Sequence, residues 1–130
     1  MIVLDASALV DVVIRSGRRP YVLSRIRDET VCAPGHQPAE VLSALARLTR
    51  SGLLSPAAAR TAIDDAIGLD QEIAPITRAH LRRALDLGAG VRVVDGLYVA
   101  LAEERGCPIL TTDRRLARTV TTCEVLVHPD

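Results

Sequence analysis

The sequence predicts an α/β fold in which helices cover a parallel sheet. Short apolar runs alternate with longer stretches whose apolar residues recur at the helical period, which is the pattern of such a fold. The chain has 130 residues, of which 48% are hydrophobic, so it is long enough to bury one core without disulfides or a structural metal. A second domain would be too small to fold alone at this length. We therefore expect residues 1–130 to form one domain.

The first half of the chain predicts two strands and four helices. Residues 2–4 are a short apolar strand that ends at Asp5, and the turn-forming stretch 17–20 ends the helix that follows. Two later helices carry proline in the first turn, where it is tolerated, and end at Gly52 and near Gly68. The expected elements are a strand at 2–4, helices at 7–14 and 21–27, a strand at 31–33 broken by Pro34 and Gly35, and helices at 36–50 and 55–68.

The second half predicts three strands and three helices. Glycines at 88 and 90 close one helix, and Gly106 and Pro108 separate the next helix from an apolar run that ends at Asp113. The expected elements are a strand at 72–76, helices at 77–87 and 94–104, a strand at 109–111, a helix at 114–118 and a strand at 124–127.

Composition excludes several classes of function. All 16 basic residues are arginine, so lysine nucleophiles, Schiff bases and P-loop lysines are excluded. The 16 acidic residues balance them, which argues against binding nucleic acid by bulk attraction. Three cysteines and three histidines stand at no metal-ligand spacing, so a zinc site is not expected and the cysteines are interpreted as reduced thiols. No segment predicts export or a membrane span, and we expect a cytoplasmic protein.

Four acidic residues from distant parts of the chain are expected to meet. Asp5 and Asp113 each follow a predicted strand, and the carboxyl ends of parallel strands form one edge of a sheet. Glu40 and Asp95 lie in the first turns of helices, which begin at that same edge. Each acid taken alone is equally well explained as a helix cap or dipole partner. The remaining acids that we considered are assigned to solvated faces: Asp11, Asp64, Asp65 and Asp86.

A cluster of four carboxylates predicts a divalent metal site. Like charges in a partly dry pocket raise one another's pKa unless a cation joins them, and oxygen ligands without His or Cys select Mg²⁺ or Mn²⁺. Such a site suits phosphoryl chemistry. Ser7 and Thr112 adjoin the acids and are expected to orient a carboxylate or hold water, or simply to bond nearby backbone amides. Arg114 and Arg115 are candidates for contact with the phosphate groups of a substrate, or else belong to a solvated face.

Four segments, each containing one of these acids, occur in order along the chain. Their sequences are IVLDASAL at 2–9, PAEVLSAL at 38–45, VDGLYVALA at 94–102 and ILTTDRRL at 109–116. In this order they resemble the PIN domain ribonucleases and, within that family, the VapC-type toxins of bacterial toxin-antitoxin pairs, over essentially the whole chain. One departure is Gly96, where alanine or a bulkier residue is more usual, and this glycine is expected to loosen the position of Asp95.

The resemblance implies a doubly wound parallel sheet of order 3-2-1-4-5 and a Mg²⁺-dependent endoribonuclease. It also implies four catalytic acids, which are Asp5, Glu40, Asp95 and Asp113 in this sequence. Asp5 and Asp95 would be the leading metal ligands. Glu40 and Asp113 would hold metal-bound waters or a second ion. The substrate would be structured RNA such as tRNA, cut to leave 5′-phosphate and 3′-hydroxyl ends, and a cognate antitoxin would silence the enzyme.

Other classes of function compete with this interpretation. A phosphoacceptor receiver domain also gathers aspartates at a sheet edge, but it needs a lysine that this chain lacks. A catalytically silent interaction module with the PIN fold is distinguished by whether the four carboxylates meet. A metal-dependent nuclease acting on DNA shares the chemistry, and substrate assays separate it.

Two expectations concern partners. Apolar stripes on the helices at 21–27, 36–50 and 55–68 exceed what one small sheet covers, which predicts a homodimer. Because the chain carries no net charge to attract an inhibitor, an antitoxin is expected to insert an arginine among the four acids, where a guanidinium replaces the charge of the metal.

Overall fold

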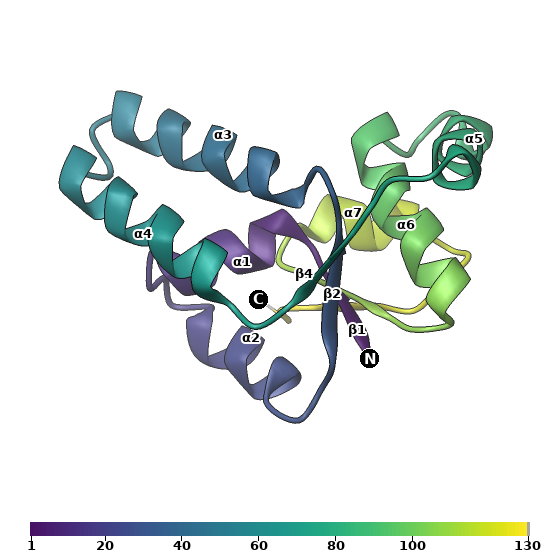
Figure 1. The fold of residues 1–130 in the computed structure, drawn as a ribbon, viewed down its shortest axis with the longest axis horizontal. Coiled ribbons are helices and arrows are strands. Elements are labelled where there is room, and N and C mark those ends of the chain that lie inside the picture. The colour runs from purple at the N-terminus through teal and green to yellow at the C-terminus, as the bar shows by residue number, and fades with distance from the viewer. Residues whose placement is uncertain (130) are drawn as a thin grey trace.

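A computed structural model describes residues 1–129 and shows a five-stranded sheet (Figure 1). The strand order is β3-β2-β1-β4-β5, and all four pairings are parallel. This confirms the predicted fold class and strand order. The strands are β1 (Ile2–Leu4), β2 (Val31–Pro34), β3 (Glu72–Ala74), β4 (Ile109–Thr111) and β5 (Val125–Val127).

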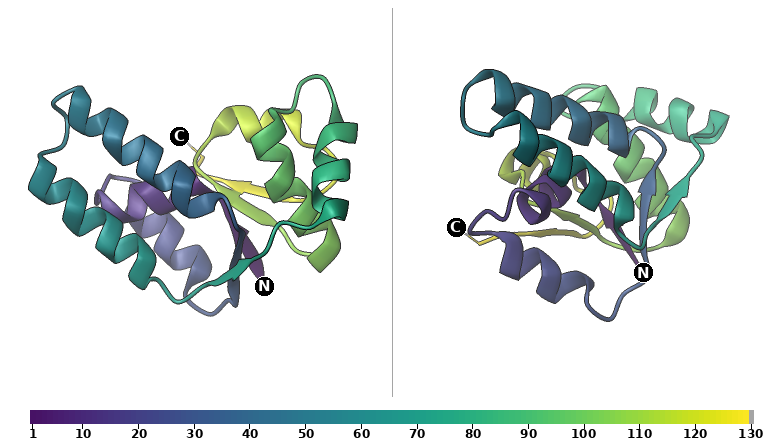
Figure 2. Two further views of the ribbon diagram at one scale, coloured as in Figure 1. Left: turned by 45° about the horizontal axis from the view of Figure 1, so that its top comes forward. Right: turned by 60° about the vertical axis from the view of Figure 1, so that its left-hand side comes forward.

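Helices cover both faces of this sheet. Figure 1 shows α1 to α4 on one side of the strands and α5 to α7 on the other, and Figures 1 and 2 both show α3 and α4 side by side as an antiparallel pair. The helices are α1 (Ala6–Val13), α2 (Arg19–Ile26), α3 (Gln37–Arg50), α4 (Pro56–Gly68), α5 (Arg78–Leu87), α6 (Val93–Arg105) and α7 (Arg114–Thr119). Among the described residues, no helix has the length and hydropathy that crossing a bilayer requires.

Three strand boundaries differ from those predicted, one of them at β5, which begins at Val125 instead of Glu124. Pro34 belongs to β2 and pairs with Ala74, because a proline at the last position of a strand removes only one donor from the ladder. β3 ends at Ala74 instead of Ile76, since Pro75 has no backbone N–H with which to continue the pairing. All three differences lie at strand ends, so the order of the elements is unchanged.

The core is aliphatic and is centred on β1, β4 and α6. Every residue of β1 and β4 is buried, and α6 is buried without interruption from Asp95 to Ala102. Tyr98, in the middle of that run, is the largest fully buried side chain in the described chain. Because α6 is enclosed on all sides, the acidic residue in its first turn is held by a rigid element.

The pairing of β1 with β4 determines where the functional residues meet. Val3 aligns with Ile109 and Leu4 with Leu110, and β1 also pairs with β2 on its other side. The chain therefore leaves β1 at the point where the strand order reverses, and in open α/β sheets this is where ligands bind. Asp5 and the residues that end β4 lie side by side there.

Gly96 allows α5 to pack closely against α6. A Cβ at this position would lie 3.0 Å from both the Cα and the Cβ of Ala84, which is tighter than nine in ten real Cβ contacts, so α5 would have to move by a few tenths of an ångström. The glycine is thus a packing requirement between two helices, and Asp95 beside it is only 8% exposed. The expectation that Gly96 loosens Asp95 stays a prediction beside this packing role.

We expect Gly96→Ala to destabilise the protein. Overpacking costs roughly 1–3 kcal/mol, whereas alanine improves an interior helix position by only about 1 kcal/mol. Urea denaturation should show a net fall in the free energy of unfolding. Gly68→Ala is the matched control, because nothing lies within 4 Å of a Cβ on this glycine, and it should be neutral or stabilising. Equal gains in both variants would contradict the packing role of Gly96.

Candidate active site

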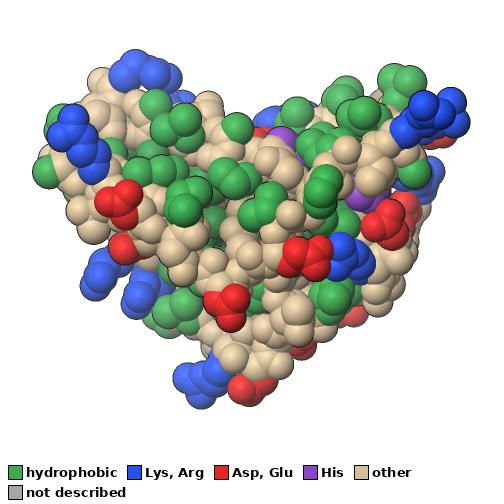
Figure 3. All heavy atoms as spheres, in the orientation of Figure 1, with side chains coloured by type: hydrophobic (Ala, Val, Ile, Leu, Met, Phe, Trp, Pro, Cys, Tyr) green, Lys and Arg blue, Asp and Glu red, His purple; other side chains and the backbone are tan. Residues whose placement is uncertain are grey.

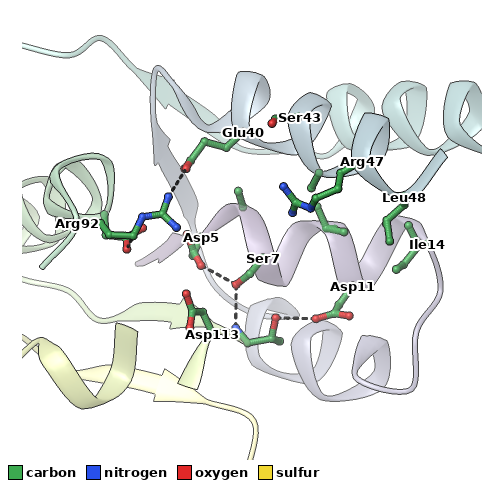
Figure 4. A pocket seen from close by; sticks show the side chains of 15 residues that line it. Asp5, Ser7, Asp11, Ile14, Glu40, Ser43, Arg47, Leu48, Arg92 and Asp113 are labelled. Carbon is green, nitrogen blue, oxygen red and sulfur yellow. Dashed lines mark hydrogen bonds and ion pairs between the residues drawn. The ribbon is translucent and has the colours of Figure 1, made fainter. Parts of the chain in front are cut away.

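Four acidic residues line one pocket of about 440 Å³ at the carboxyl edge of the sheet (Figure 4). Asp5 follows β1, Glu40 lies in the first turn of α3, Asp95 lies in the first turn of α6, and Asp113 is the N-cap of α7. Four elements that are far apart in sequence thus bring carboxylates to one place. The arrangement is the one expected from the strand ends and helix starts.

Asp5 is the most deeply buried of the four acids. It is 5% exposed, and its Oδ2 accepts hydrogen bonds from Ser7 Oγ at 2.6 Å and from Thr111 Oγ1 at 2.7 Å. Burial raises the pKa of Asp5, the charges of Glu40 and Asp113 raise it further, and the two hydroxyls act in the opposite direction. Within the described residues its side chain caps no amide of α1, so the capping interpretation does not hold for Asp5.

Asp95 faces the same pocket between two arginines. Its Oδ2 lies 3.7 Å from Arg92 Nε and 3.6 Å from Arg115 NH2. Burial raises the pKa of Asp95 despite the nearby guanidinium of Arg92, and the charges of Asp5 and Glu40 add to the rise. The surroundings of both Asp5 and Asp95 therefore disfavour the ionised form of the carboxyl group.

The surroundings of Glu40 lower its pKa instead of raising it. Burial acts to raise its pKa, but hydrogen bonds from His36 and Tyr98 outweigh burial, and the pKa is lowered overall. Tyr98 Oη donates to Glu40 Oε1 at 2.8 Å, and His36 Nε2 lies 3.3 Å from the same oxygen. Arg92 NH2 lies 4.0 Å from Glu40 Oε2, as Figure 4 shows. The pocket thus holds one carboxylate that is stabilised as the anion beside two that are not.

Asp113 caps α7 and also lies on the pocket. Its Oδ1 accepts from the backbone amides of Arg115 at 2.9 Å and of Leu116 at 3.4 Å. Its Oδ2 accepts from Arg115 NH2 at 3.0 Å. The capping interpretation is therefore correct for Asp113. The same side chain also lies at the rim of the pocket.

Thr111, and not Thr112, holds the carboxylate of Asp5. Thr111 is fully buried, and its Oγ1 also accepts the backbone N–H of Asp113 at 2.9 Å. Thr112 was expected to orient a carboxylate, and the one that it contacts is Asp11: its hydroxyl donates to Asp11 Oδ2 at 2.6 Å, while its N–H donates to Ser7 Oγ at 3.1 Å. The register of β1 and β4 places Asp5 opposite Thr111, and successive strand residues point to opposite faces.

Asp11 belongs to the pocket, which corrects its assignment to a solvated face. Its carboxylate accepts from Thr112 Oγ1 and, at 2.6 Å, from Ser16 Oγ. Asp11 follows Ser7 by four residues on α1, so the two side chains lie on the same helix face. That spacing was the signal in the sequence that would have identified it.

The arginines around the pocket neutralise part of its charge. Arg115 pairs with Asp95 and Asp113, and both Arg115 and its neighbour Arg114 are exposed. Arg92 and Arg47, which the sequence did not single out, also line the pocket. Figure 4 shows Arg92 beside the acids and Arg47 toward the far end, near Leu48 and Ile14. The pocket therefore runs from an acidic end to a more apolar one.

The residues at the acidic end fit a divalent cation by the chemistry of their side chains. All four are carboxylates. Burial raises the pKa of both Asp5 and Asp95, and the charges of neighbouring acids raise it further. In the described part of the chain, no three side chains of the types that bind metals are already arranged as a metal site. Small side-chain adjustments around a cation would therefore be needed, and hard oxygen donors favour Mg²⁺ or Mn²⁺.

Comparison with known proteins identifies similar sequences and folds. The model of the PIN domain family matches residues 2–121. The chain is 44% identical to Ribonuclease VapC3 of Mycobacterium tuberculosis over 123 residues, covering 90% of this chain and 85% of the relative. It is 37% identical to Ribonuclease VapC12 of the same organism over 118 residues, covering 91% of each.

Solved structures share the fold at low sequence identity. VapBC2 from Rickettsia felis, bound to a DNA fragment from its promoter, superposes with a TM-score of 0.73 at 12% identity, covering 98% of this chain and 99% of that one. VapC20 from Mycobacterium tuberculosis, described as a toxin that cleaves the sarcin-ricin loop, superposes with a TM-score of 0.69 at 15% identity, covering 91% and 94%.

Proposed function

This chain belongs to the PIN domain family and, within it, to the VapC ribonucleases, and we propose that it is the toxin of a toxin-antitoxin pair that hydrolyses RNA with a divalent metal ion. The observation that carries the proposal is the convergence of four carboxylates from four elements around one pocket. A catalytically silent module would have no use for carboxylates that burial destabilises. We propose that residues 1–130 act as one PIN domain in the cytoplasm, where RNA substrates and reduced thiols occur together.

We assign the chemistry of the pocket as follows. Asp5 and Asp95 would hold the ion, Mg²⁺ or Mn²⁺, because burial and the neighbouring acids disfavour their negative charge and a cation would offset that cost. When bound, the ion supplies charge that activates water and stabilises the leaving oxygen of the phosphodiester. Ser7 and Thr111 hold Asp5 in place through their hydroxyls. Glu40 and Asp113 would orient water at the pocket, and one of them would accept its proton as the water oxygen bonds to phosphorus. The P–O3′ bond breaks, and the leaving 3′ oxygen takes a proton from solvent, which gives 5′-phosphate and 3′-hydroxyl ends.

The proposal is tested by incubating the purified protein with total tRNA in Mg²⁺, in Mn²⁺ and with a chelator. We expect discrete tRNA fragments with 5′-phosphate ends in either metal, and a loss of cleavage of at least roughly 100-fold with the chelator. Parallel reactions contain single- and double-stranded DNA. Cleavage of DNA alone would identify a DNA nuclease, and the absence of cleavage in every reaction would favour the interaction module.

A cognate antitoxin is the second partner that we propose, in keeping with the VapBC pairs that share this fold. It is expected to place an arginine among the acids and an apolar helix or strand along the continuation of the pocket, near Val10, Ile14 and Leu48. Metal and antitoxin then compete for one site. Calorimetric titration of the antitoxin should show weaker affinity in saturating Mg²⁺, and an unchanged affinity would refute this mode of inhibition.

We also propose a homodimer, and we assign part of its surface to α5. The apolar faces of α2, α3 and α4 largely pack against α1 and the sheet. Five residues of these faces are buried: Val22, Val41, Leu45, Ala62 and Ala66. Large apolar side chains remain exposed on α3 and α4, at Leu42 (58%) and Ile67 (66%), and on α5, at Leu81 (56%) and Leu85 (72%). Figure 3 shows hydrophobic side chains on either side of a notch in the upper edge of the molecule.

Light scattering at micromolar concentration should give the mass of a dimer. Leu81→Asp combined with Leu85→Asp should shift that mass to the monomer, because charge on both exposed positions opposes burial of α5 against a second copy. Leu53→Asp is the control, since Leu53 is also exposed (77%) but lies in the turn between α3 and α4. A monomer in the unmodified protein would refute the dimer.

A further inference from the structure

Tyr98 links the two helices that carry Glu40 and Asp95. It follows Asp95 by three residues on α6, so the two side chains lie on the same face of that helix. Its ring is fully buried, and its hydroxyl crosses to α3, where it donates to Glu40 Oε1 at 2.8 Å. The phenol therefore spans from the core to the acidic pocket.

The carboxylate of Glu40 is held from two sides. His36 Nε2 lies 3.3 Å from the oxygen that accepts from Tyr98, and the same nitrogen lies 2.9 Å from the backbone oxygen of Val94 at the start of α6. The rings of His36 and Tyr98 are themselves in contact, with centroids 4.9 Å apart. Arg92 approaches the other oxygen of Glu40 at 4.0 Å. Of these donors, the Tyr98 hydroxyl is the one presented by a fully enclosed side chain.

The hydroxyl of Tyr98 is not needed to fill the core. A phenylalanine ring would occupy the same buried space, so packing alone does not account for the oxygen atom. Placing that oxygen against a carboxylate has a defined effect, because a glutamate side chain has rotatable bonds whose freedom a fixed donor removes. What the hydroxyl adds is the position of Glu40.

We infer that Tyr98 is a positioning residue for the nuclease reaction, and that its hydroxyl holds the carboxylate of Glu40 in the pocket beside Asp5 and Asp95. The inference rests on the proposed function, in which Glu40 orients water or accepts its proton. Tyr98 touches neither substrate nor metal in this role. It acts through Glu40, and its loss affects the chemical step more than the binding of RNA.

Tyr98→Phe should lower kcat for RNA cleavage by roughly 10- to 100-fold while changing KM by less than about twofold, because a hydrogen bond to a charged group is lost outside the substrate-binding surface. Tyr21→Phe is the matched control. It also removes one tyrosine hydroxyl, but that hydroxyl donates to the backbone oxygen of Val127 on β5 at 3.0 Å, away from the pocket. Its kcat should equal that of the unmodified protein.

A spectroscopic measurement tests the same contact without catalysis. The chain has two tyrosines and no tryptophan or phenylalanine, so Tyr21→Phe leaves Tyr98 as the dominant near-ultraviolet chromophore. Adding Glu40→Gln to this variant should shift the absorbance band of Tyr98 to shorter wavelength, because a neutral amide accepts a weaker hydrogen bond than a carboxylate. Adding Asp64→Asn, which changes an exposed acid on α4, should leave the band unchanged.

The outcomes separate this inference from the proposed function. If Glu40→Gln abolishes cleavage and Tyr98→Phe cleaves at the full rate, the positioning role is wrong and the nuclease assignment stands. If the Tyr98 band does not move in the Glu40→Gln variant, the contact is absent and the inference is wrong whatever the activities. If Glu40→Gln cleaves RNA normally, the assigned role of Glu40 fails first, and the positioning role fails with it even where the band shift is seen.

Discussion

Asp5→Asn is expected to reduce RNA cleavage by at least about 1,000-fold, which corresponds to several kcal/mol of transition-state stabilisation supplied through the metal. The substitution keeps the volume of the side chain and one oxygen for the hydroxyls of Ser7 and Thr111. It removes the negative charge that we assign to metal binding. The rate of tRNA fragmentation in saturating Mg²⁺ measures the effect.

The same substitution should make the metal-free protein more stable at neutral pH. Burial raises the pKa of Asp5 above its ordinary value of 3.8, so the folded chain binds this proton more tightly than the unfolded chain does. This contribution to stability is fully present at pH values below the pKa of Asp5 in the unfolded chain. It is lost as the pH rises through the pKa of Asp5 in the folded chain. Ionised Asp5 therefore opposes folding at neutral pH, and asparagine relieves that cost.

Urea denaturation in a chelator should accordingly show a higher free energy of unfolding for Asp5→Asn at neutral pH, and a smaller difference in acid. Mg²⁺ should stabilise the unmodified protein and not the variant, because a ligand stabilises only the state that binds it. Asp64→Asn is the control and should change neither property. Retained Mg²⁺-dependent cleavage in Asp5→Asn would contradict the metal assignment, and unfolding of the variant would point to a structural role for Asp5.

Thr111→Val is expected to lower the free energy of unfolding by roughly 2–4 kcal/mol, because it removes two buried hydrogen bonds at once. Valine has nearly the same shape, so packing is preserved. It leaves the carboxylate of Asp5 with one hydroxyl donor fewer and the backbone N–H of Asp113 without its acceptor. Cleavage should fall as well, by roughly tenfold or more, since Asp5 is then less firmly oriented.

Thr112→Val provides the comparison. Thr112 is only partly buried, and its hydroxyl makes one hydrogen bond to Asp11, so we expect a loss of about 1 kcal/mol and a smaller effect on cleavage. Denaturation curves of the two variants, measured side by side, check the difference. If Thr112→Val were the more damaging substitution, the assignment of Thr111 as the residue that holds Asp5 would be wrong.

Much of the fold followed from patterns that are local in the sequence. Apolar runs bounded by glycine and proline predicted each strand and helix in order, because side-chain periodicity and turn chemistry act over a few residues. The meeting of Asp5, Glu40, Asp95 and Asp113 followed from one further rule, that parallel strands end, and their helices begin, at a common edge. Neither step required the contacts of any individual side chain.

The partners of each carboxylate were decided only by the tertiary structure. The register between β1 and β4 sets Thr111 against Asp5, and a shift of one residue would have placed Thr112 there instead. The approach of α6 to α3 brings Tyr98 to Glu40 across 58 positions of sequence, and the close packing of α5 on α6 accounts for Gly96. Hydrogen bonds depend on distances of a few tenths of an ångström, and only the packing of complete elements determines those distances.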